Sequence, residues 1–113
     1  MTLAEKLSPQ RVTGYSPTMY RIVGAVTGIT INAIDARPYR EFSITSDGFV
    51  IAQPGSRESG DFLGTYSDFE RNIRRYVEDA ELTLDEQEQF AKLLSARVMD
   101  WRTAMHLQPK SAR

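Results

Sequence analysis

The stretch of residues 20–53 is rich in β-branched and aromatic apolar residues, a pattern typical of β-strands, and divides into two predicted hairpins. Asp47-Gly48 is a strong signal for a two-residue hairpin turn, because a type I′ turn needs positive φ at both central positions. This turn places Ile44 opposite Ile51 on the paired strand. One face of the hairpin then carries the large apolar residues Phe42, Ile44, Phe49 and Ile51. A slip of one residue would divide this set between the faces, so turn and pattern predict the same register.

An earlier hairpin is predicted with its turn at Thr27-Gly28, which places Val26 opposite Ile29. Its apolar face would hold Ile22, Gly24, Val26, Ile29, Ile31 and Ala33. Joined through Arg37-Pro38, the two hairpins would form a four-stranded antiparallel meander with one strongly apolar face.

Residues 66–106 carry helical periodicity twice. The first helix is predicted to begin at a capping box of Ser67 and Glu70, and the second at Thr83 and Glu86. The apolar positions of the first are Phe69, Ile73, Tyr76, Val77 and Ala80, and those of the second are Phe90, Ala91, Leu94, Val98, Trp101 and Met105. Both helices need an apolar surface to cover, and the sheet offers one. We therefore expect an α+β fold, a two-layer sandwich in which two C-terminal helices cover one face of the meander.

The length of 113 residues fits a single domain, 1–113, with one core. Residues 1–18 are predicted to form a flexible or arm-like N-terminus with a short helix over Leu3 to Leu7. Residues 54–60 form a loop rich in glycine, serine and charge, and residues 107–113 are expected to fray.

Composition is that of an ordinary globular protein, with 41% apolar and 26% charged residues. The chain has no cysteine, which excludes disulfides, thiolate metal sites and cysteine nucleophiles and favours a reducing cytoplasm. The longest uncharged stretch, Ile22 to Ile34, is too short and too polar to span a bilayer, and no signal-like apolar run begins the chain. We expect a cytoplasmic protein that does not enter a membrane.

Signals for catalysis are weak. The only histidine, His106, lies on a different helical face from Asp100, so the two form no acid–base pair. The sequence contains no nucleophile elbow, phosphate-binding loop, dinucleotide fingerprint or zinc-protease motif. Acidic residues crowd positions 78–88, but no glycine there allows the tight loop that calcium sites need. We predict no catalytic residue, metal site or cofactor, although a ligand pocket or active site between sheet and helices stays an alternative.

Arginine outnumbers lysine eleven to three, and one end of the predicted sheet gathers several guanidiniums. The anion-binding candidates are Arg21, Arg37, Arg40, Arg57 and Tyr39. Guanidinium groups suit phosphates and carboxylates, but Asp35, Glu41 and Glu58 share that end and could pair with them instead. Nucleic-acid binding is disfavoured, because net charge is −1 and the predicted outer sheet face carries no aromatic residue for stacking.

The predicted outer sheet face is too apolar to stay in water, which usually marks an interface. The N-terminal arm could cover it, or a second copy or another protein could do so. In the last helix the spacing of Leu94, Val98, Trp101 and Met105 follows a heptad seam, for which packing on the sheet is the alternative explanation. The interface candidates are Val23, Ala25, Ile34, Val50, Leu94, Val98, Trp101 and Met105. The leading hypothesis is a non-catalytic, homodimeric protein-interaction module, and the alternatives are an anion or nucleic-acid binder and a small-ligand protein or enzyme.

Overall fold

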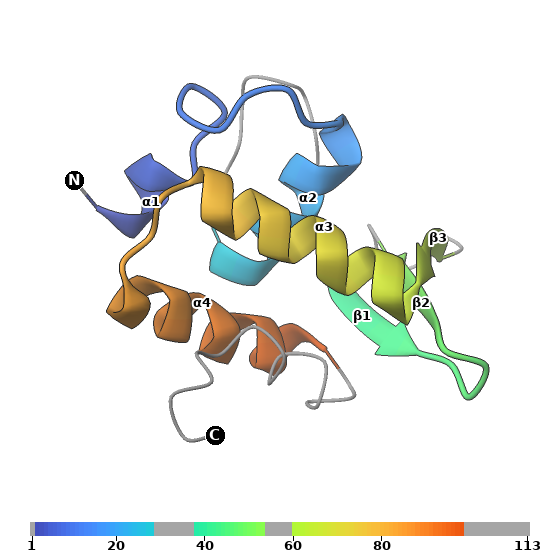
Figure 1. Ribbon diagram of the computed structural model, residues 1–113. Coiled ribbons are helices and arrows are strands. Elements are labelled where there is room, and N and C mark those ends of the chain that lie inside the picture. The colour runs from blue at the N-terminus through green and yellow to red at the C-terminus, as the bar shows by residue number, and fades with distance from the viewer. Residues whose placement is uncertain (1, 29–37, 54–59, 99–113) are drawn as a thin grey trace.

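Three antiparallel strands and four helices make up the part of the chain that the computed structural model describes, residues 2–28, 38–53 and 60–98 (Figure 1). The helices are α1 (Leu3–Lys6), α2 (Pro17–Thr27), α3 (Tyr66–Asp79) and α4 (Leu84–Arg97). The strands are β1 (Glu41–Ile44), β2 (Phe49–Gln53) and β3 (Asp61–Thr65), ordered β1-β2-β3 in one sheet. The α+β class is confirmed. The sheet, however, has three described strands and not the first hairpin of the predicted meander.

The hairpin of β1 and β2 is confirmed, but its predicted register is wrong by one residue. Ile44 pairs with Val50, not with Ile51. In the turn only Gly48 has positive φ, at 86°, so the connection has three residues that end in a left-handed glycine. The backbone N–H of Thr45 donates to Phe49 O at 2.9 Å and closes this turn. The slip turns Phe49 and Ile51 to the face opposite Phe42.

The predicted first hairpin is wrong, because residues 17–27 form α2. The Ser16 side chain accepts from Met19 N, Pro17 stands at the first helical turn, and Gly28 closes the helix with φ 74°. Gly24 to Gly28 therefore belong to a helix and its cap, not to a strand and its turn. The helix is apolar on most sides because it is almost wholly buried: Met19, Tyr20, Ile22, Val23, Gly24, Ala25 and Val26 all lie in the interior. Residues 29–37, the remainder of that hairpin, lie outside the described residues.

Strand β3 lies at residues 61–65, between the predicted loop and the predicted helix, where no element was predicted. It pairs antiparallel with β2, with an irregularity that leaves Leu63 without a partner in the register. Gly64, with φ 114°, directs the chain from strand to helix, where Thr65 accepts from Asp68 N as the N-cap. Helix α3 thus begins earlier than the predicted Ser67. Its predicted apolar positions are confirmed as buried: Phe69, Ile73, Tyr76, Val77 and Ala80.

Helix α4 begins as predicted, with the Thr83–Glu86 capping box present. Phe90, Ala91 and Leu94 are buried. The helix ends at Arg97, and Val98 is extended and forms a parallel bridge with Phe42 of β1. The predicted helical seam therefore does not run on through Val98, and Trp101 and Met105 lie outside the described residues.

Helix α2 packs on α4, and α3 packs on β2 and β3, so that α3 links the helical part to the sheet end (Figure 1). The N-terminal segment is held against this body by tyrosine hydroxyls. Tyr76 donates to Leu7 O at 2.9 Å and Tyr20 to Val12 O at 2.6 Å, and both Leu7 and Val12 are buried. Burial raises the pKa of the Tyr76 hydroxyl, which keeps it a protonated donor.

Candidate functional site

Two exposed phenylalanines lie side by side on the face of the sheet that points away from the core. Phe49 of β2 and Phe62 of β3 have ring centroids 5.3 Å apart and an interplanar angle of 64°, an edge-to-face contact. Their exposed fractions are 38% and 63%. Ile51, half-buried, pairs with Phe62 across the strands. We call Phe49, Ile51 and Phe62 the outer sheet face.

Gly60 explains how Ile51 keeps its place in this face. A Cβ atom on Gly60 would lie 2.4 Å from Cγ2 of Ile51, closer than real contacts allow. The backbone just before β3 therefore runs directly against the Ile51 side chain, and only glycine permits that approach.

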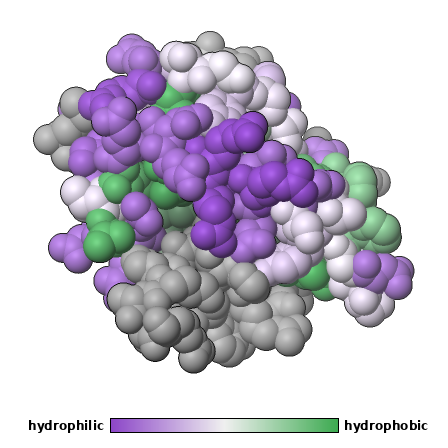
Figure 2. All heavy atoms as spheres, in the orientation of Figure 1, coloured by the Kyte–Doolittle hydropathy of each residue, from purple (hydrophilic) through white to green (hydrophobic). Residues whose placement is uncertain are grey.

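The three residues of the outer sheet face are uncharged, and Glu41, at the start of β1, lies on the same side of the sheet. None of the three strands contains a basic residue, and their acidic residues, Glu41 and Asp61, stand at strand ends. Figure 2 shows hydrophobic residues exposed at the sheet end, beside a hydrophilic strip along α3. Among the described residues the other exposed large apolar side chains are Leu84 and Leu93, which lie singly on α4. Isolated apolar side chains are ordinary, whereas an adjacent aromatic pair is a candidate contact surface.

The expectation that the outer face carries no aromatic residue is wrong, because it rested on the slipped register. Two phenylalanines could in principle stack nucleobases. Single-strand binders, however, combine such aromatics with cations that follow the phosphates, and these strands supply none. The face suits an apolar protein surface better than a nucleic acid.

Two of the five anion-binding candidates meet in the structure. Tyr39 is buried, and its hydroxyl donates to Asp61 Oδ2 at 3.2 Å. The Arg21 Nη1 atom lies 4.0 Å from the same carboxylate oxygen, and its guanidinium carbon lies 6.0 Å from the centre of the Tyr39 ring. Burial, together with the Asp61 carboxylate, raises the pKa of Tyr39. Asp61 thus supplies the negative charge that Arg21 faces; it was not among the carboxylates named for the ion-pair alternative.

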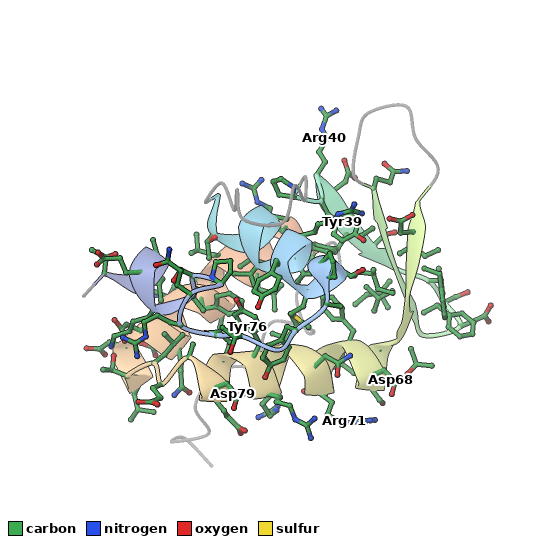
Figure 3. All side chains as sticks on the ribbon, turned by 90° about the horizontal axis from the view of Figure 1, so that it is seen from above. Tyr39, Arg40, Asp68, Arg71, Tyr76 and Asp79 are labelled. Carbon is green, nitrogen blue, oxygen red and sulfur yellow. The ribbon has the colours of Figure 1, made fainter. Side chains whose placement is uncertain are left out.

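The remaining candidates are not part of this contact. Arg40 is exposed and extends outward at the sheet end, away from Tyr39 (Figure 3). Its backbone N–H donates to Gln53 O at 2.6 Å, which continues the β1–β2 ladder. Arg37 and Arg57 lie outside the described residues. Whether any of the five binds an anion stays a prediction.

The predicted interface residues lie inside the fold wherever the structure describes them. Those described are at most 5% exposed: Val23, Ala25, Val50, Leu94 and Val98. Val23 and Ala25 are helical and Val50 points inward, so the premise that these three form an outer sheet face is wrong. Ile34, Trp101 and Met105 lie outside the described residues. Phe49 and Phe62 were missed, and a three-residue turn ending at Gly48 would have been the signal for Phe49.

No protein-family model, curated protein or solved structure matches this chain. Within residues 2–28, 38–53 and 60–98, no helix has the length and apolar character needed to cross a membrane. The same residues contain no group of three or more acidic or histidine side chains placed to hold a metal ion.

Proposed function

We propose that this protein is a non-catalytic interaction module that self-associates through the outer sheet face. The observation that carries the proposal is the adjacent, solvent-exposed pair Phe49 and Phe62 on strands without a basic residue. Aromatic side chains supply large contact area at low entropic cost, and they are enriched at the centres of interfaces.

A second copy of this chain fits the face in charge. In a two-fold dimer both copies use the same patch, so a patch with a net charge would be repelled by its image. Phe49, Ile51 and Phe62 carry no charge, and the whole chain has a net charge of only −1. The register also places one acidic residue, Glu41 at the start of β1, on this side of the sheet. The three apolar side chains can therefore meet those of a second copy without repulsion between charges of their own.

The sheet packs face to face in this proposal and not edge to edge. The edge strand β3 has an irregular register at Leu63 and a left-handed residue at Gly64. Bulges of this kind twist an edge and hinder the pairing of another strand. The phenylalanine side chains, in contrast, project from the face and are free to pack between two stacked sheets.

The affinity should be modest. The exposed fractions of Phe49 and Phe62 together equal about one whole phenylalanine side chain per copy, worth about 1.5–3 kcal/mol on burial. A stable dimer usually buries about 800 Å² on each copy, so polar residues around the pair must contribute as well. We expect a dissociation constant on the order of 0.1 mM.

The test is sedimentation equilibrium across a concentration series that brackets this value. The double variant Phe49→Ser, Phe62→Ser should remain a monomer where the unchanged protein gains mass. The matched control is Leu84→Ser, Leu93→Ser, because these leucines are 66% and 38% exposed but lie on α4. A monomeric unchanged protein throughout the series, or equal loss of association in both double variants, would overturn the proposal.

A further inference from the structure

We propose a second site: an open cavity between the start of β1 and the end of α4 that binds a small carboxylic acid. The cavity has a volume of about 400 Å³ and is lined by Arg40, Glu41, Ala96, Arg97 and Val98. This volume falls at the small end of the range for pockets that hold small molecules. Its lining contains none of Phe49, Ile51 and Phe62, and the inference does not depend on self-association.

The backbone on both sides of the cavity is fixed. Val98 forms a parallel bridge with Phe42, which joins the end of α4 to β1. Opposite it, Arg40 N donates to Gln53 O at 2.6 Å. Arg97 Nε donates to the carbonyl of Ala25, a buried residue of α2, at 2.8 Å. That bond anchors one edge of the guanidinium and leaves its two terminal nitrogens for another acceptor.

Three other described arginines each face a carboxylate. Arg71 has the Asp68 carboxylate at 3.0 Å, Arg74 has Glu70 at 3.0 Å, and Arg21 has Asp61 at 4.0 Å. Within the described part of the chain, neither Arg40 nor Arg97 has a carboxylate within 4.0 Å. These two guanidiniums are therefore available to an outside anion.

The charge of the lining indicates the class of ligand. Among the described lining residues, two arginines and Glu41 leave one net positive charge, which matches a monoanion better than a phosphate dianion that Glu41 would repel. A carboxylate suits the planar guanidinium fork. Glu41 can in turn accept a hydrogen bond from a hydroxyl or ammonium group on the same molecule. A small hydroxy acid or amino acid has this combination.

Glycolate, acetate and inorganic phosphate are the probes, followed by the amide shifts of Arg97 and Val98 in heteronuclear NMR spectra. Glycolate should shift them saturably, with a dissociation constant on the order of 1 mM, and more tightly than acetate or phosphate. Arg40→Gln should weaken glycolate binding about tenfold. This variant tests the site without a folding penalty, because no described hydrogen bond or ion pair uses the Arg40 side chain.

Arg71→Gln is the matched control, because Arg71 lies on α3 on the opposite side of the molecule from Arg40 (Figure 3). It should bind glycolate as the unchanged protein does. Glu41→Gln should abolish the preference for glycolate over acetate and strengthen phosphate binding. Shifts that do not saturate, glycolate binding unaffected by Arg40→Gln, or phosphate as the tightest ligand of the unchanged protein would each overturn the inference.

Discussion

The two faces of the sheet place phenylalanine side chains in opposite environments, one buried and one exposed to water. Phe42 on the inner face has no exposed surface and contacts the rings of Tyr39 and Phe69, at centroid distances of 6.0 and 5.8 Å. Phe49 and Phe62 on the outer face contact each other and water. A turn of three residues instead of two decides this difference, because strand side chains alternate with a period of two. The core and the candidate interface are thus set by one conformational choice at residues 46–48.

Truncation of one inner and one outer phenylalanine tests the difference between the two faces with the largest expected effect. Phe42→Ala should lower the free energy of unfolding by about 3–5 kcal/mol, because it removes buried surface and leaves a cavity. Phe49→Ala should cost at most about 1 kcal/mol, because its ring is already partly in water. Urea unfolding of each variant measures both values. Similar losses for the two would show that the faces are not distinct.

The turn itself supplies the next largest effect. Gly48→Ala should lower the free energy of unfolding by about 1–2 kcal/mol, since an alanine resists positive φ. The cost is conformational, because no other atom lies within 4 Å of the new methyl position. Asp47→Ala should be nearly neutral, because φ at Asp47 is not positive. In a two-residue type I′ turn both central positions have positive φ, so alanine would be strained at either one. Comparable losses of unfolding free energy in the two variants, measured by chemical denaturation, would therefore support the two-residue turn and its register.

A smaller effect, the dependence of folding stability on pH, distinguishes the helical body from the outer sheet face. A hydrogen bond from Lys6 at 2.8 Å, with a second from Thr83 N, holds the pKa of the Glu86 carboxyl below the ordinary value of 4.5. A lowered pKa in the folded state stabilises the protein fully above the unfolded value, and this gain is lost as pH falls through the folded value. The stability advantage over Glu86→Gln should shrink in that window.

Self-association should not follow the same acid dependence, because Phe49, Ile51 and Phe62 do not titrate. Urea midpoints and sedimentation at matched pH values provide the two readouts. An advantage over Glu86→Gln that does not change with pH would contradict the role of Lys6. Self-association that weakens with falling pH in parallel with the stability advantage over Glu86→Gln would contradict an interface built on residues that do not titrate.

Local signals predicted two of the helices around the core, α3 and α4. The Thr83–Glu86 capping box and the apolar spacing from Phe69 to Ala80 both describe what the structure contains, because caps and helical periodicity act within a few residues. Helix α2 was misread because Ile22, Val23 and Val26 favour strands intrinsically, whereas burial on most sides supports them in a helix.

The candidate interface could not be predicted from the sequence, for a different reason. Asp47-Gly48 is compatible with both a two-residue and a three-residue turn, and the choice between them depends on packing elsewhere in the fold. Strand β3 is only five residues long and contains glycine, so its alternation is too brief to recognise. Phe62 therefore could not be placed beside Phe49 from the sequence.

The most direct test of the outer sheet face is an isotope-filtered NOE experiment on a mixture of labelled and unlabelled protein. It detects contacts only between different copies, at a concentration where association is measurable. We expect NOEs from the Phe49 and Phe62 rings of one copy to the Phe62 ring and Ile51 methyls of the other. Intermolecular NOEs confined to other surfaces, such as the exposed Leu84 and Leu93 of α4, would contradict the account.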